Sequence, residues 1–186
     1  MLRRRSFTGI IAMLTGVLAM HVGVSLANRK SSRSACAGAR TVPVDEATRR
    51  QATVAVLCLV NRLRARHRLR RVHFSFGLTV AALQHSGDMV RRTYFSHDGP
   101  DGDTPSARAR RSGYIRPHRS FALSEAMAWG EDITPAGLVR TLRLSPPHRE
   151  ILLDRDQRDI GIGLSLGAPV SGVSTSSSTL VLAFGH

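Results

Sequence analysis

The chain has 186 residues, enough for one domain with a core of its own, and carries a formal net charge of +14 at pH 7. Arginine supplies nearly all of this charge, since Lys30 is the only lysine in the sequence. The arginines are scattered without interleaved aromatic residues, a pattern that argues against nucleic acid as a partner. The charge instead favours an anionic lipid or cell-envelope polymer, although a biased composition explains the arginines equally well.

Residues 1–27 predict an export signal. Three consecutive arginines from Arg3 precede an apolar stretch over 7–26, and small residues at 25–27 offer a cleavage site. Glycines and a histidine dilute the apolar stretch, so we expect a cleaved signal peptide and a secreted, extracellular protein. An uncleaved signal would instead anchor the chain in the membrane.

Residues 28–43 predict a linker or arm, because they are rich in Ser, Ala, Gly and Arg without an apolar period. The folded domain is expected over 44–186. Two cysteines, Cys36 and Cys58, follow the export signal, and disulfides persist outside the cytoplasm. We expect one bridge between them, worth about 3 kcal/mol. A metal site is disfavoured, because the two cysteines lack a C-x-x-C spacing and neighbouring histidines.

Apolar spacing predicts two long helices at the start of the domain. The first covers about 45–67 and the second about 77–93, joined by a connection over 68–76. His85 lies on the apolar face of the second helix. A lone histidine in such a place is more often a hydrogen-bonded core residue than a ligand, and we favour that interpretation.

Shorter helices are predicted over about 104–112, 134–144 and 148–153, where Thr-Pro or Ser-Pro-Pro sequences mark the starts of the elements. Three aspartates occupy the loop 98–103 before the first of these helices. The loop lacks the downstream glutamate of an EF-hand, so it predicts a solvated turn in preference to a calcium site.

Three apolar segments predict the strands of a small sheet. Residues 121–129 form a strand or extended segment, and 160–166 with 179–184 form a hairpin. Glu125 lies inside the first segment, where a buried carboxylate needs a partner. It either forms a structural pair with one of the many arginines or belongs to a functional site. Helices on both sides of this mainly antiparallel sheet give an α+β fold.

Chemistry is concentrated in a few short motifs that come in a characteristic order. They are Asn61-Arg62, His85-Ser86 with Asp88-Met89, Tyr94-Phe95-Ser96-His97, Glu125 before Trp129, Ser145-Pro146-Pro147-His148-Arg149, and Ile160-Gly161-Ile162-Gly163. In this order the chain resembles the bacterial form of the CAP superfamily, also called SCP-like, which is named after cysteine-rich secretory proteins, antigen 5 and pathogenesis-related 1 proteins. The resemblance covers about 45–185.

The resemblance implies a three-layer α-β-α sandwich with a cleft that carries two histidines and two glutamates and holds a divalent metal in some members. By the same resemblance His97 and His148 are the cleft histidines and metal ligands, and Glu125 is one of the carboxylates. Two imidazoles completed by water would hold zinc only weakly.

The sequence departs from the family pattern in ways that bear on catalysis. Ser124-Glu125-Ala126 stands where the family has Gly-Glu-Asn, and no carboxylate lies between Thr134 and Pro147, so the second glutamate is missing. Glu125 or a histidine remains as the candidate general base.

These features favour a secreted, monomeric binding module over an enzyme. The cleft of His97, Glu125 and His148 would hold a lipid, a cell-wall fragment or a small apolar ligand without turnover. The alternative is a metal-dependent hydrolase in which His97 and His148 hold the metal and Glu125 serves as the base. A third candidate role is contact between the basic surface and an anionic lipid or polymer.

Overall fold

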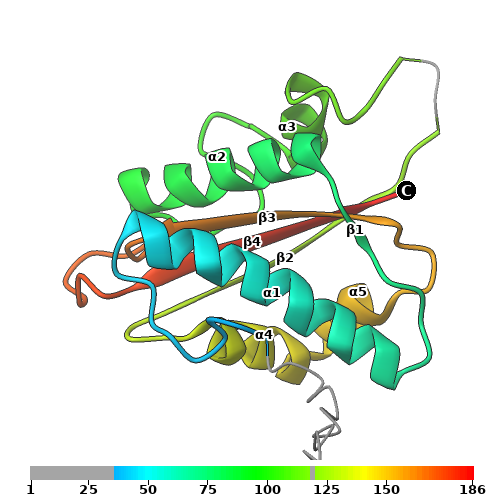
Figure 1. Ribbon diagram of the computed structural model, residues 1–186. Helices are drawn as coiled ribbons and strands as arrows, with labels where there is room; N and C mark the ends of the chain where they lie inside the picture. The colour runs from blue at the N-terminus through cyan, green and yellow to red at the C-terminus, as the bar shows by residue number, and fades with distance from the viewer. Residues whose placement is uncertain (1–35, 118–119) are drawn as a thin grey trace, which may run out of the picture. The chain divides into compact units, whose positions relative to one another are not determined.

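The computed structural model describes residues 36–117 and 120–186 (Figure 1). In these ranges the helices and strands are α1 (Glu46–Arg66), β1 (His73–Phe74), α2 (Phe76–Arg92), α3 (Pro105–Arg111), β2 (Leu123–Gly130), α4 (Pro135–Leu144), α5 (Pro146–Leu153), β3 (Asp159–Leu166) and β4 (Ser178–Gly185). The predicted signal peptide and the first part of the predicted arm lie outside the described residues. Within the described ranges, no helix is both long enough and apolar enough to cross a membrane.

Local sequence explains where the helices begin. The side chains of four N-cap residues each accept a hydrogen bond from a backbone N–H of the first turn; they are Asp45, Ser75, Thr104 and Thr134. The helix expected over 148–153 begins earlier, at Pro146. Two prolines fit this first turn because its N–H groups have no partner inside the helix.

The strands form one mixed sheet in the order β1-β3-β4-β2. β3 and β4 pair antiparallel, as predicted for the hairpin, and β2 pairs antiparallel with the other edge of β4. β1 lies in the segment 68–76, for which the sequence predicts a connection and no strand. It has two residues and pairs parallel with the start of β3.

The helices lie on both faces of this sheet, which confirms the predicted three-layer arrangement (Figure 1). α2 packs on β3 and β4 with α3 beside it, whereas α1, α4 and α5 pack together on the other face. The larger core lies on the α1 side and includes Val56, Leu138, Leu164 and Phe184, all fully buried. A smaller cluster on the α2 side is built around Met89, Met127 and Val181.

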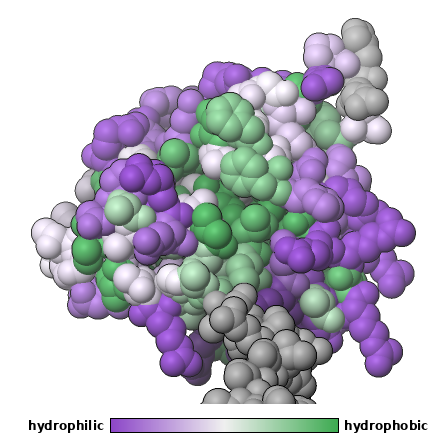
Figure 2. Space-filling view, in the orientation of Figure 1, coloured by the Kyte–Doolittle hydropathy of each residue, from purple (hydrophilic) through white to green (hydrophobic). Residues whose placement is uncertain are grey.

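The outer edge of β3 beyond the short β1 is blocked by side chains. Thr79 on α2 accepts a hydrogen bond from the Ile162 N–H at 3.3 Å, and Arg49 on α1 donates one to the Leu164 carbonyl at 3.2 Å. Figure 2 shows hydrophobic residues gathered on this face, between the two helices and flanked by hydrophilic ones. The capped edge offers few free backbone groups to a further strand.

The predicted disulfide joins Cys36 to Cys58, with a Cα–Cα distance of 5.7 Å. Cys58 lies in α1, so the bridge ties the segment before this helix to its middle. A second link comes from the Ala136 N–H, which donates to the Ala39 carbonyl at 2.9 Å at the start of α4. The segment over 36–41 is therefore fastened to two helices.

Two glycines of β3 let α2 lie directly on the sheet. A Cβ atom at Gly161 would overlap the Leu78 carbonyl group, and one at Gly163 would overlap that of Ala82. The alternating Ile-Gly-Ile-Gly sequence thus keeps the helix backbone in contact with the strand. This contact fixes the height of α2, and with it the position of the loop that follows α2.

Replacing Gly161 with alanine tests this close approach. The new methyl group must push α2 away from β3, so we expect the free energy of unfolding to fall by about 3 kcal/mol, the upper end of the usual cost of overpacking. Chemical denaturation measures the change.

Gly87→Ala in α2 is the matched control, since a Cβ there would meet its nearest neighbours at an ordinary 3.7 Å. Alanine in a helix is more favourable than glycine by up to about 1 kcal/mol, so this variant should be as stable as the parent or more stable. Equal losses of stability in both variants would contradict the packing described.

Candidate functional site

Glu125 lies in the middle of β2 with its side chain turned toward the α2 and α3 layer. The neighbouring residues Ala126 and Ala128 belong to the core on the other face, as strand alternation requires. The Glu125 side chain is only 6% exposed. Its Oε1 lies 2.8 Å from His97 Nδ1, and its Oε2 accepts a hydrogen bond from Arg108 Nη2 at 3.0 Å. The carboxylate is therefore buried, and both of its oxygens are engaged.

Arg108 on α3 supplies the charge that balances Glu125. The residue is 1% exposed. Besides Glu125, its guanidinium donates to the backbone carbonyl of His97 at 2.9 Å and to that of Asp103. One buried cation thus holds the carboxylate and two points of the loop between α2 and α3, at His97 and at Asp103. Glu125 thus forms the structural pair with an arginine that was one of the two alternatives predicted from the sequence.

His97 stands between Glu125 and solvent, with a side chain that is 52% exposed. The hydrogen bond to Glu125 is the main cause that raises the pKa of His97, and burial opposes it. Among the described residues its Nε2 makes no hydrogen bond. The ring therefore presents one anchored nitrogen and one nitrogen available to a ligand.

His85, on α2, supports the same loop from within the core. It is 2% exposed, and its Nε2 lies 2.9 Å from the Ser96 carbonyl oxygen, so Nε2 must carry the donated proton. Burial lowers the pKa of His85, mainly by penalising the charged form. Tyr94 closes the arrangement by donating to Asp88 Oδ2 at 2.8 Å. His85 is thus a hydrogen-bonded core residue, as the sequence favoured.

His148 occupies the first turn of α5 and is half-buried. Burial is the main cause that lowers its pKa, and the charge of His97 lowers it further. Among the described residues, no hydrogen bond joins the two histidines. Of the three predicted cleft residues, the structure therefore brings His97 and Glu125 into direct contact and leaves His148 as a neighbour.

The family model of the cysteine-rich secretory protein family, abbreviated CAP, matches residues 57–178. This chain belongs to the CAP family. The match includes both histidines and Glu125, and it covers all five helices at least in part. A search of curated proteins gives no significant match.

Solved structures show the same fold. An extracellular protein containing an SCP domain from Bacillus anthracis is 23% identical over 76% of this chain, with a TM-score of 0.61. The chain corresponds to 44% of that protein, less than half of its length. An outer surface protein from Borrelia burgdorferi is 20% identical over 73% of this chain and 92% of its own, with a TM-score of 0.60.

The residues predicted to hold a metal offer few ligands in this structure. Within the described ranges, no three His, Cys, Asp or Glu side chains cluster so as to hold an ion. His97 Nδ1–H donates a hydrogen bond to Glu125, an arrangement that orients a ligating imidazole and leaves Nε2 without a partner among the described residues. His97 and His148 would thus supply two imidazoles, one fewer than the three protein ligands of a usual catalytic zinc site.

Arg108 is the site residue that sequence reasoning missed. In the sequence it is one of many scattered arginines, and arginine content alone gives no reason to single it out. The only signal was indirect: a carboxylate inside an apolar strand must have a cationic or hydrogen-bonding partner. Which arginine meets it depends on how α3 packs on β2.

Replacing Arg108 with methionine should destabilise the domain strongly. The substitution leaves the Glu125 carboxylate buried without its cation, so we expect the free energy of unfolding to fall by about 3–5 kcal/mol. Thermal and chemical denaturation at neutral pH measure the loss.

The control is Arg111→Met on the same helix, where an arginine that is 56% exposed pairs with Asp103 at 2.7 Å. Exposed pairs contribute about 0–1 kcal/mol, so this variant should stay close to the parent. Similar losses in the two variants would mean that Arg108 has no special role.

The raised pKa of His97 predicts a dependence on Glu125 that NMR can measure. In a pH titration of the histidine rings, His97 should titrate above its ordinary value of 6.5 and His85 below it. Glu125→Gln should lower the pKa of His97, whereas Glu131→Gln, at an exposed position, should leave it unchanged.

The sign for stability follows from the same shift. The folded state binds the His97 proton more tightly than the unfolded state does, so the contribution is fully present below about pH 6.5. It is lost as the pH rises through the folded-state pKa. An unchanged His97 pKa in Glu125→Gln would remove the basis of this account.

Proposed function

We propose that this CAP domain is a secreted binding protein whose exposed wall, formed by Phe95, His97 and His148, holds a ligand without chemical turnover. The observation that carries the proposal is the state of Glu125, which lies buried beneath His97 and paired with Arg108. The matching solved structures include extracellular and outer-surface proteins, which supports a location outside the cytoplasm.

Glu125 is poorly placed to act as a general base. A base must come within about 2.6–3.2 Å of the proton it removes, directly or through one water. Glu125 is 6% exposed, and His97 lies between it and solvent. The cavity that reaches Glu125 from the core side has a volume of only about 10 Å³, room for about one water molecule. A substrate from outside therefore meets the imidazole first.

The two serines that flank the site are not activated as nucleophiles. Ser96 and Ser124 flank the site, but the Ser96 hydroxyl accepts a hydrogen bond from the Asp98 N–H and the Ser124 hydroxyl accepts one from Gln157. Neither hydroxyl is hydrogen-bonded to an imidazole among the described residues. An unactivated serine is a weak nucleophile at neutral pH, so covalent catalysis has no support here.

The exposed wall offers a ligand both an apolar surface and a hydrogen-bonding group. Phe95 is 43% exposed and lies two residues before His97, whose Nε2 makes no hydrogen bond among the described residues. An exposed aromatic ring beside a polar group suits a molecule with an apolar face and a hydrogen-bonding group. A lipid or a cell-wall fragment has this character, and both occur where an exported protein would meet them.

The metal-dependent hydrolase remains the second candidate, favoured by the orientation of the His97 ring. A zinc ion at His97 and His148 would supply a polarised water. The chain offers no free carboxylate among the expected site residues to deprotonate this water, because the second glutamate of the family is absent and Glu125 is paired with Arg108. This makes binding without turnover the better-supported function.

Co-sedimentation with isolated peptidoglycan and with phosphatidylcholine vesicles tests the binding wall. At about 0.5 M salt, where exposed charges are screened within a few ångströms, we expect at least one of the two to pellet the protein. Phe95→Ala and His97→Ala should release it into the supernatant.

Phe76→Ala is the matched control, because Phe76 is 75% exposed at the opposite end of α2. This variant should pellet like the parent. Absence of pelleting with both probes, or equal losses in all three variants, would overturn the proposed wall.

Metal analysis separates the two candidate functions. Protein purified without chelator, together with its His97→Ala and His148→Ala variants, should contain far less than one zinc per chain in all three cases. One equivalent of zinc that both substitutions remove, together with chelator-sensitive release of soluble peptidoglycan fragments, would replace binding by hydrolysis.

A further inference from the structure

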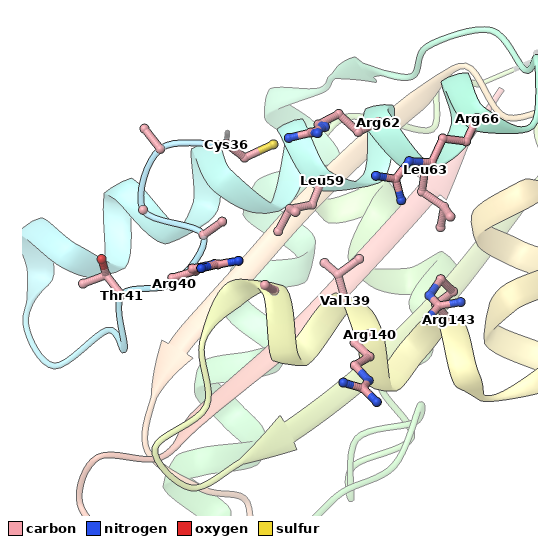
Figure 3. A pocket seen from close by; sticks show the side chains of 14 residues that line it. Cys36, Arg40, Thr41, Leu59, Arg62, Leu63, Arg66, Val139, Arg140 and Arg143 are labelled. Carbon is pink, nitrogen blue, oxygen red and sulfur yellow. The ribbon is translucent and has the colours of Figure 1, made fainter. Parts of the chain in front are cut away.

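A second candidate site lies on the opposite side of the sheet from Glu125. Between α1, α4 and the segment over 36–41 there is a hollow of about 660 Å³ (Figure 3). Its volume is within the range of about 300–1,000 Å³ that is usual for small-molecule sites. Five arginines line it: Arg40, Arg62, Arg66, Arg140 and Arg143.

These five arginines differ from several others in the fold. Within the described ranges, none of their side chains makes a hydrogen bond or an ion pair, whereas Arg49, Arg92 and Arg111 each pair with a carboxylate. No Asp or Glu lines the hollow. The parts of the chain outside the described ranges, 1–35 and 118–119, contain none either, so they cannot supply a carboxylate. The hollow thus concentrates positive charge without a carboxylate in its lining.

The floor of the hollow is apolar. Figure 3 shows Leu59 and Leu63 on α1 facing Val139 on α4, with Arg40 reaching in from the segment before α1. Leu59 is half-buried, and Leu63 and Val139 are 8% and 6% exposed, so the floor offers a narrow apolar surface. An anion without an apolar part would use the arginines but leave this surface in contact with water. The lining therefore suits a ligand that has both an anionic group and an apolar body.

The wall formed by 36–41 is fastened before any ligand binds. Cys36, which lines the hollow, is bonded to Cys58 of α1, and the Ala39 carbonyl accepts the Ala136 N–H of α4 at 2.9 Å. A site held in place in this way loses less conformational entropy on binding than a loose loop would. This constraint makes the hollow a feature of the folded state.

We infer that this hollow binds a phosphate-bearing amphiphile, with a phosphate or diphosphate group on the arginines and an apolar chain along Leu59, Leu63 and Val139. The planar guanidinium group matches phosphate oxygens with two parallel hydrogen bonds. Several guanidinium groups at one site exceed what a single carboxylate can neutralise, and they match the multiple charges of a diphosphate. This site is independent of the wall at His97 and does not rest on the function proposed for it.

Calorimetric titration with geranyl diphosphate tests the inference, with geraniol and inorganic diphosphate as the two halves of the probe. Geranyl diphosphate should bind with an affinity at least about tenfold higher than geraniol or inorganic diphosphate. Only the whole molecule contacts both the arginines and the apolar floor. Arg140→Gln with Arg143→Gln should weaken it by about tenfold or more, the effect of losing charge-assisted hydrogen bonds. Arg62→Gln with Arg66→Gln, on the facing helix, should do the same.

The control pair is Arg71→Gln with Arg116→Gln, two exposed arginines outside the hollow that remove the same net charge. These substitutions should leave the affinity unchanged. Leu59→Asn should weaken geranyl diphosphate but not inorganic diphosphate. No binding, equal affinity for geranyl and inorganic diphosphate, or equal losses in the control pair would overturn the inference, the last by showing general attraction to a basic surface.

Vesicles that contain phosphatidate distinguish the source of the phosphate group. Pelleting that is lost in Arg140→Gln with Arg143→Gln would identify a membrane lipid headgroup as the ligand. Titration with geranyl diphosphate in the absence of such pelleting would identify a free molecule. Both results support the inferred chemistry, and thermal unfolding of each variant ensures that any loss comes from the site.

Discussion

The candidate site depends on a buried ion pair between Arg108 and Glu125. Burying a charge is costly unless it is paired and its remaining hydrogen-bonding groups are satisfied. Here Arg108 also donates to the carbonyls of His97 and Asp103, and Glu125 also binds the His97 ring. The pair therefore fixes a strand, a helix and the loop between α2 and α3 in one arrangement. His97 faces solvent because of it.

This arrangement changes the role that the family resemblance assigns to the cleft. In this chain the carboxylate orients a histidine and neutralises an arginine, and its side chain is only 6% exposed. The second carboxylate is missing from the sequence, and His148 makes no hydrogen bond to His97 among the described residues. The buried carboxylate thus positions His97, and on this arrangement rests the proposal of recognition in place of proton transfer.

Much of the fold could be predicted from sequence because its signals are local. Helical spacing, Thr-Pro starts and the alternating strands depend on near neighbours, and so does the inward face of α2 with His85 on it. The disulfide followed from the count of cysteines and the export signal. β1 could not be predicted, since two residues carry no period, and it exists only because β3 lies beside it.

The site itself was only partly predictable, for a physical reason. The motifs identified His97 and Glu125, but their hydrogen bond and the role of Arg108 arise from contacts between elements far apart in the chain. The hollow beside α1 is similar: its arginines come from three segments that only the tertiary fold brings together. Arginines that look alike in the sequence thus have two different roles in the fold: Arg108 forms a buried ion pair, and five others line the open hollow.

The most direct test of the central claim is the side-chain NMR spectrum of Arg108. A guanidinium held by Glu125 and two backbone carbonyls cannot rotate freely, so its Nη protons should give separate, slowly exchanging signals from about pH 5 to pH 8. Selective assignment with Arg108→Lys identifies the signals. A single averaged Nη signal, as for an exposed arginine, would show that the pair is not fixed and that Glu125 is free for another role.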